Sequence, residues 1–293
     1  AALVILVALA IPLVGLTTAM PSIKVLPEDS SARVGYDYVQ AGLGEGAPGM
    51  LSIVVPTDEV AATEQVLKAE PGIAAAMPAM EPTDGVDLRM IQAVPTVDPS
   101  DPALAQTVEN LRADLPDGAL VGGAAVENLD LKAQLDTSTP IVIAVVMVLG
   151  FLLLLVALQA PLISLLGTLV SLLSTAAAFG VARLIFQDGI GASFFGFESQ
   201  GFLDAWGPIF FFAMIFAIAM DYTVFLLASA KEHWEKEGTA KAAMVGAVAH
   251  SGRVIFAAGG VMVAVFFTFA LSGPLPPKEM GIILGVAVLL DAF

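Results

Sequence analysis

Six apolar runs decide what this chain can fold into. By number they cover residues 1–20, 138–158, 162–186, 208–230, 254–272 and 280–293. A helix rises about 1.5 Å per residue, so about 20 apolar residues cross the roughly 30 Å hydrocarbon core of a bilayer. Such a segment must satisfy its own backbone hydrogen bonds, which favours helices. We therefore predict an α-helical polytopic membrane bundle of six spans.

Both ends of the chain lie inside apolar runs. The first residue is not Met, and no basic stretch precedes the first run, which argues against an intact signal peptide. The final run, residues 280–293, would reach only about 21 Å as a helix. We expect that this last span is truncated and that the chain is a fragment.

A hydrophilic block at residues 21–137 follows the first run and carries 19 acidic and 6 basic side chains. Its patterns predict a strand at 50–56, a helix at 57–70, strands at 72–79 and 86–94, a helix at 101–115 and a strand at 119–123. The order β-α-β-β-α-β is that of an α+β ferredoxin-like domain. A further helical pattern at 124–139 is expected to continue into the next span.

Basic residues in the short loops give the orientation. The segment 231–253 contains Lys231, Lys236, Lys241 and Arg253, whereas the segment 187–207 contains no Lys or Arg. Loops rich in these residues stay in the cytoplasm. We therefore place the 231–253 segment, which begins with an amphipathic helical pattern, in the cytoplasm and the 21–137 block outside it.

Several function classes have no support in the sequence. The chain has no cysteine, and His233 and His250 lack a metal-ligand pattern, so no metal site and no cofactor are predicted. The acidic block argues against nucleic-acid binding. A Walker loop for ATP is also missing, so any transport work would draw on an ion gradient or another chain.

Asp221 is the main candidate for a functional residue, because it stands in the middle of the apolar run 208–230 and is followed by Tyr222. An ionised group at that depth costs several kcal/mol, so it usually faces protein or water and takes part in function. One reading is a proton relay, in which Tyr222 offers a hydroxyl to a carboxylate. The other is a fixed strut that assembles the bundle. Asp291, in the last run, is either a further relay member or a structural pairing residue.

The run AIAMDYTVFLLASAKEHWEKEG at 217–238 resembles the mycobacterial-membrane-protein-large (MMPL) family of the resistance-nodulation-division superfamily. Residues 21–46, the run SGRVIFAAGGVMVAVFF and the run KEMGIILGVAVLLDAF resemble it too, as does the plan of one span, a large outer porter domain and five spans. In that family each half supplies an Asp-Tyr pair from its fourth helix, and Asp221 and Tyr222 fall on the fourth span here.

The resemblance implies a multi-pass transporter of the bacterial plasma membrane, driven by protons, that exports lipids or other hydrophobic molecules. The chain looks like helices seven to twelve, so its partner would be the missing N-terminal half with the second Asp-Tyr pair. Assembly into a homo-oligomer is left open. No enzymatic activity is expected.

Two other functions compete with export. A sterol-sensing-like lipid receptor or assembly protein would keep the same helices without proton coupling, and Asp221 would then be structural. An intramembrane aspartyl protease would use Asp221 and Asp291 as a carboxyl pair. The residues before Asp221 are Ala219 and Met220, not the Gly-x-Gly typical of such proteases.

Overall fold

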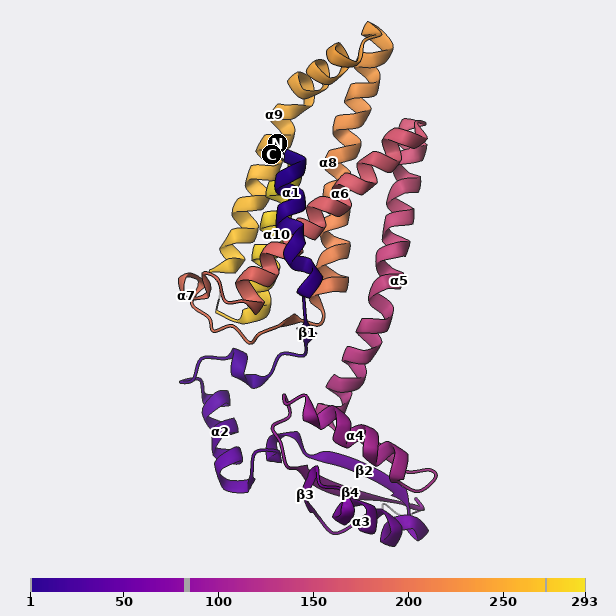
Figure 1. Ribbon diagram of the computed structural model, residues 1–293, viewed down its shortest axis with the longest axis vertical. Coiled ribbons are helices and arrows are strands. Elements are labelled where there is room, and N and C mark those ends of the chain that lie inside the picture. The colour runs from indigo at the N-terminus through magenta and orange to yellow at the C-terminus, as the bar shows by residue number, and fades with distance from the viewer. Residues whose placement is uncertain (1, 82–84, 272, 293) are drawn as a thin grey trace. The chain divides into compact units, whose positions relative to one another are not determined.

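The computed structural model describes residues 2–81, 85–271 and 273–292, and Figure 1 shows its ribbon. The chain divides into two compact units. One is Met20–Gln134, which contains the predicted hydrophilic block except for its last three residues. The other combines the residues up to Ala19 with those from Leu135 onward.

Four strands form one antiparallel sheet in the Met20–Gln134 unit. They are β2 (Leu51–Pro56), β3 (Ile73–Ala76), β4 (Leu88–Pro95) and β5 (Leu120–Gly122), in the order β3-β4-β2-β5. The helix α3 (Val60–Ala69) links β2 to β3, and α4 (Ala103–Asp114) links β4 to β5. Each strand and helix predicted between residues 50 and 123 thus overlaps an observed one, in the predicted order.

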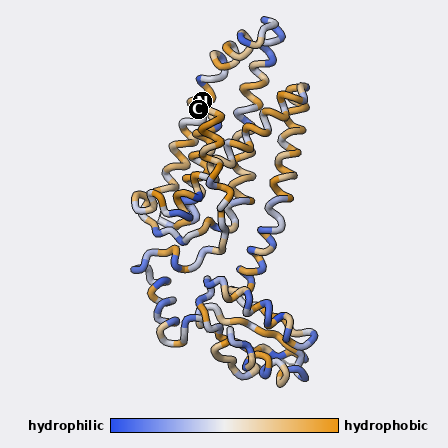
Figure 2. Tube along the Cα trace, in the orientation of Figure 1, coloured by the Kyte–Doolittle hydropathy of each residue, from blue (hydrophilic) through white to orange (hydrophobic). Residues whose placement is uncertain are grey.

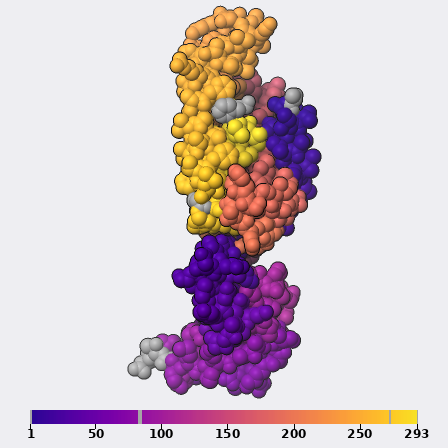
Figure 3. All heavy atoms as spheres, turned by 90° about the vertical axis from the view of Figure 1, so that its left-hand side faces the viewer, coloured from indigo at the N-terminus to yellow at the C-terminus, as the bar shows by residue number. Residues whose placement is uncertain are grey.

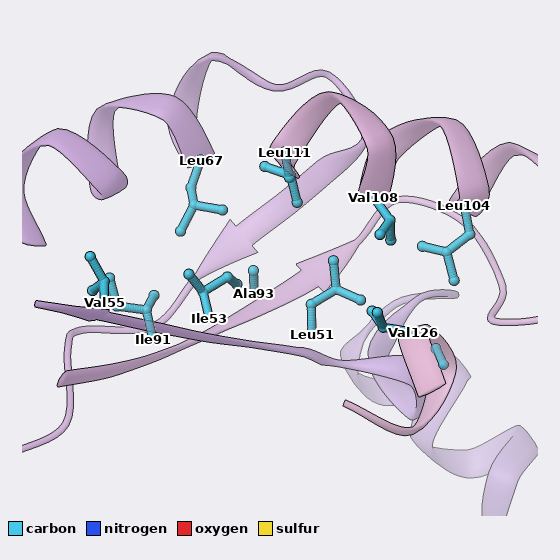
Figure 4. Packing of buried hydrophobic residues seen from close by; sticks show 11 residues of the cluster. Leu51, Ile53, Val55, Leu67, Ile91, Ala93, Leu104, Val108, Leu111 and Val126 are labelled. Atoms are coloured by element: carbon cyan, nitrogen blue, oxygen red, sulfur yellow. The ribbon is translucent and has the colours of Figure 1, made fainter. Parts of the chain in front are cut away.

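The core of this unit lies between the sheet and its two helices (Figure 4). Burial alternates along β2, because successive side chains of a strand point to opposite faces. The helices supply residues at helical spacing. The fully or nearly fully buried cluster consists of Leu51, Ile53, Val55, Leu67, Ile91, Ala93, Leu104, Val108, Leu111, Ala125 and Val126.

The helix α2 (Ser31–Leu43) was not predicted from the sequence, and one carboxylate attaches it to the rest of the unit. Asp98, which follows β4, accepts hydrogen bonds on Oδ2 from Tyr36 Oη at 2.9 Å and from Gln40 Nε2 at 2.7 Å, both on α2. The same oxygen pairs with Lys24 Nζ at 3.0 Å. Asp98 therefore connects two segments far apart in the chain.

The ionised form of Asp98 makes these contacts. Its burial on its own would raise the pKa, but hydrogen bonds from the Ser100 hydroxyl and N–H, from Lys24 and from Tyr36 outweigh burial, so the pKa of Asp98 is well below its ordinary value. Burial and the hydrogen bond to Asp98 raise the pKa of Tyr36. Tyr36 is thus neutral, and its hydroxyl can donate a hydrogen bond to Asp98.

Attachment of α2 should weaken in acid. Because the folded pKa of Asp98 is lowered, its stabilisation is present above the ordinary value of about 4 and is lost as the pH falls below it. We expect the hydrogen-exchange protection factors of α2 in the full chain to fall about tenfold or more in that range, as for loss of a charged hydrogen bond. Asp98→Asn should show the reduced protection already at neutral pH.

Asp117→Asn, which removes an exposed carboxyl from the same unit, is the matched control. It should leave the protection of α2 as in the wild type. Equal protection in Asp98→Asn and Asp117→Asn at neutral pH would contradict the role given to Asp98.

The apolar unit is made of long helices, which appear as orange runs in Figure 2. Four are long and apolar enough to cross a membrane: α5 (Ala124–Leu158), α6 (Pro161–Ala182) with its π-helical end Arg183–Gln187, α8 (Gly207–Glu237) and α9 (Ala240–Ala270). The other two predicted spans correspond to shorter helices, α1 (Ala2–Ala10) with the 3-10 turn Ile11–Gly15, and α10 (Leu275–Ala292). The pattern at 124–139 does continue into the next helix, because α5 is unbroken.

Two very short turns join the long helices in pairs. Only Gln159 and Ala160 separate α5 from α6, as predicted, and Pro161 is the first residue of α6. The 231–253 segment is not a loop. Its amphipathic pattern belongs to the end of α8, which runs to Glu237, and its remainder starts α9. Gly238 ends α8 in a left-handed conformation, with its N–H bonded to Trp234 O at 2.8 Å.

Helix α6 contacts α1, α8 and α10. It approaches α1 closely, since a Cβ on Gly180 would overlap the carbonyl oxygen of Leu9. Three of its buried hydroxyls bond within the helix: Ser164 to Ala160 O, Thr168 to Ser164 O and Thr175 to Ser171 O, at 2.8–2.9 Å. The polar side chains of α6 are thus compatible with an apolar environment.

A small polar clasp holds the end of the first helix. Arg183 Nη1 donates to Pro12 O at 2.7 Å, and Gln187 Nε2 donates to Gly15 O at 3.0 Å, so the π-helical end of α6 satisfies terminal carbonyls. The next residues form β1 (Thr18–Ala19), which pairs in parallel with β6 (Leu203–Asp204). This strand pair was not predicted from the sequence.

Candidate functional site

Asp221 lies on an exposed face of α8. The exposed residues Ala217, Phe225 and Ala228 share this face, at spacings of three and four residues, while Met220 next to Asp221 is buried. No hydrogen bond or ion pair joins Asp221 to any residue that the structure describes. The strut reading therefore has no partner for Asp221 within the described part of the chain.

Tyr222 points instead toward the inside of the helix bundle. It is partly buried, and its hydroxyl donates to Met262 Sδ on α9 at 3.0 Å. The sequence analysis expected a carboxylate as the acceptor. A thioether is a weak acceptor, so this bond holds the phenol in place without taking a proton from it.

Asp291 lies on α10 and is partly buried. Like Asp221, it is near enough to Tyr222 for its charge to act on the hydroxyl. The structure thus brings the three predicted relay residues, Asp221, Tyr222 and Asp291, into one region of the bundle. No hydrogen bond between the two carboxyls is found among the described residues, which leaves the shared-proton geometry of an aspartyl protease without support.

Close packing against α9 fixes the position of α10. A Cβ on Gly281 would lie 2.5 Å from Phe266 O and 2.6 Å from Ala270 N, both backbone atoms of α9. A Cβ on Gly285 would lie 3.3 Å from the ring of Phe267. Most of α10 is buried, and Figure 3 shows only a small area of it, in yellow, between α9 and α1.

The two histidines lie close together near the C-terminal end of α8. The rings of His233 and His250 are 6.2 Å apart across the α8–α9 turn, and His233 Nδ1 lies 2.8 Å from Ser229 O. The sequence did not show this proximity, since the residues are on separate helices. Within the described ranges, no group of three or more His, Cys, Asp or Glu side chains could hold a metal ion.

This arrangement suits proton transfer. An acid on an open helix face, a phenol behind it and a second acid within electrostatic reach can take up and release a proton when hydration or a neighbouring charge changes. A comparison of the sequence with known proteins identifies the family. The profile of the MMPL family matches residues 88–293, a range that includes Asp221, Tyr222 and Asp291.

The chain belongs to the MMPL family. Proteins of this family are transmembrane transporters, so the helices long enough to cross a membrane are expected of a member. Membrane protein YdfJ of Bacillus subtilis is 30% identical over 305 residues, which cover 99% of this chain and 42% of YdfJ. The shared region thus extends across both units.

Mycobacterial members of the MMPL family are similar too. The mycolic acid-containing lipids exporter MmpL11 of Mycolicibacterium smegmatis is 28% identical over 310 residues, and the heme uptake protein MmpL11 of Mycobacterium tuberculosis H37Rv is 29% identical over 308 residues. Each match covers 100% of this chain and 32% of the relative. The chain therefore spans about a third of the length of these two relatives and about two fifths of that of YdfJ.

Replacing Gly281 should disturb the site by moving α10. In Gly281→Ala the new Cβ meets backbone atoms of α9, which cannot turn away, and overpacking of this kind costs about 1–3 kcal/mol. We expect a lower thermal midpoint in detergent, followed by tryptophan fluorescence. Gly252→Ala is the matched control, since its Cβ would meet only side chains, 3.6 Å away or more. A midpoint unchanged in Gly281→Ala would show that α10 is not held by this contact.

Proposed function

We propose that this MMPL chain is half of an exporter that uses the proton motive force to move lipids or other hydrophobic molecules, with Asp221 and Tyr222 as half of its proton relay. The observation that carries the proposal is the open face of α8, where Asp221 is exposed and lacks a partner among the described residues. Against lipid, an ionised carboxylate costs several kcal/mol. Protein or water must therefore cover this face.

The other half of the transporter supplies that cover in our proposal. The relatives are two to three times longer than the part that this chain matches, which leaves room for a second set of helices. A second Asp-Tyr pair from those helices would face Asp221 across the open side of α8. Asp291, near Tyr222, serves as a further relay residue on α10.

The Met20–Gln134 unit is the porter domain in this proposal. Its β-α-β-β-α-β order and its sheet order β3-β4-β2-β5 fit a ferredoxin-like fold. The proposal takes α1, α5, α6, α8, α9 and α10 as six spans and puts the unit outside the cytoplasm of a bacterial plasma membrane. The absence of Lys and Arg from residues 187–207, in contrast with residues 231–253, supports this orientation.

The names of the relatives suggest the class of substrate. One MmpL11 protein is named for export of mycolic acid-containing lipids and another for heme uptake, and both ligands are largely hydrophobic. A hydrophobic molecule that enters from the membrane would suit both. We infer a transport role for the chain rather than an enzymatic one, because the MMPL family to which it belongs consists of transporters.

Neutralising Asp221 should abolish proton-driven export. The full-length protein is placed in vesicles with an imposed pH gradient, and movement of a fluorescent phospholipid is followed in wild type and Asp221→Asn. Loss of one proton-transfer group lowers rates by about a hundredfold or more. We expect at least this loss, with normal folding and insertion.

Glu235→Gln provides the control, because it removes an exposed acid from the end of the same helix. It should export like the wild type. Gradient-dependent export that survives Asp221→Asn would rule out the relay. Lipid binding by the wild type without any gradient-dependent movement would instead favour a receptor that keeps the MMPL helices without proton coupling.

A further inference from the structure

Asp204 and Glu279 form a second carboxyl pair, away from Asp221. Asp204 belongs to β6 and is 8% exposed, while Glu279, on α10, is 2% exposed. The N–H of Asp204 donates to Glu279 Oε2 at 3.4 Å, although the residues are 75 positions apart. Two buried acidic residues thus meet at the strand pair β1–β6, where the backbone of Asp204 is bonded to the side chain of Glu279.

The neighbouring cations are engaged elsewhere. Lys278 is 4% exposed, and its Nζ donates to Phe195 O and, at 3.1 Å, to Gly196 O. Arg183 donates to Pro12 O and lies 3.8 Å from Asp188. Neither cation forms an ion pair with Asp204 or Glu279 in the described structure. Residues 187–207 contain no Lys or Arg, and their other charged residues, Asp188 and Glu198, are also acids.

Two ionised carboxylates cannot stay buried together at low cost. Each loses its hydration, they repel each other, and a cation is needed to compensate. Carboxyl pairs in such surroundings keep one proton between them. We propose that Asp204 and Glu279 are a proton-binding site that holds one shared proton and that this proton keeps α10 attached to the β1–β6 strand pair.

Asp204 connects the shared proton to the β1–β6 strand pair. Asp204 Oδ1 accepts from Trp206 N at 3.0 Å at the start of α8, and its flanking residues make the strand pair, with Leu203 N bonded to Thr17 O and Ala205 N bonded to Ala19 O, both at 2.9 Å. Burial raises the pKa of Asp204, opposed by its bond from Trp206. Loss of the shared proton leaves two negative charges that push Glu279 away from β6.

Infrared spectra of the full-length protein in lipid nanodiscs test the shared proton directly. A protonated carboxyl has a C=O band that an ionised one lacks. At about neutral pH, where isolated Asp and Glu side chains are ionised, subtracting the spectrum of the double variant Asp204→Asn/Glu279→Gln from that of wild type should leave the band of about one protonated carboxyl. The single variants Glu279→Gln and Asp204→Asn should each shift or remove this band, because the proton is no longer shared, and they provide a second route if the double variant does not fold.

Glu198→Gln, which removes an exposed acid from the neighbouring loop, should leave no such band in the difference spectrum. If the difference for the double variant resembles that for Glu198→Gln, both carboxyls are ionised in the wild type and the proposal is wrong. The measurement involves no transport, so its failure is separate from failure of the exporter proposal.

Hydrogen exchange tests whether the β1–β6 strand pair depends on the shared proton. Raising the pH until the pair loses its proton should lower the protection factors of the Leu203 and Ala205 amides in wild type by about tenfold. In Glu279→Gln the side chain at position 279 is neutral at every pH, so no second negative charge arises beside Asp204 and the protection should stay constant. A fall in protection of equal size in both proteins would show that the β1–β6 strand pair does not depend on the proton.

Discussion

The backbone contact between α9 and α10 at Gly281 determines where the polar groups of the apolar unit lie. Because no side chain separates the two helices there, α10 sits deep among α6, α8 and α9, and what it carries is brought to the interior. It carries Glu279 near its start and Asp291 near its end, about 18 Å apart along the helix. Both acidic centres of the unit therefore depend on one glycine contact.

The acidic residues on α10 and on or just before α8 form two groups, here called levels: Asp204 with Glu279, and Asp221 with Asp291. Asp204 precedes α8 and meets Glu279, whereas Asp221 lies within α8 in the same region as Asp291. The first level is enclosed, with both side chains more than nine-tenths buried, while the second is open on the Asp221 face. An enclosed pair can hold a proton against solvent, and an open one can exchange it. The two helices thus connect sites with different access to water.

Local patterns carried most of the prediction from sequence. The alternation in β2 and the helical spacing in α4 are repeated within a few residues, so the elements between 50 and 123 could be located without tertiary information. Charged residues concealed the true length of α8 and α9. The apolar run of α8 ends before Lys231, but the helix itself continues to Glu237. Six spans were predicted, and four helices meet the length and apolarity expected of a span.

Contacts between distant residues could not be predicted. Nothing near Asp98 in the sequence indicates that α2 will bond to it, and the acceptor of Tyr222 lies 40 residues away on another helix. The strands β1 and β6 have two residues each, which is too short for any periodic signal. Sequence reasoning identified Asp221, Tyr222 and Asp291 as individual candidates, but their shared location required the packing of α10.

The two-residue turn at Gly238 and Thr239 has a consequence for how the protein is made. Helices α8 and α9, each of 31 residues, emerge from the ribosome almost without a gap, and neither can cross the bilayer while the other waits on a flexible tether. In the proposed orientation the charged tip between them, where Lys236 pairs with Glu232, lies on the cytoplasmic side, where synthesis occurs. We therefore expect the helical hairpin that carries Asp221 and Tyr222 to insert into the membrane as one unit.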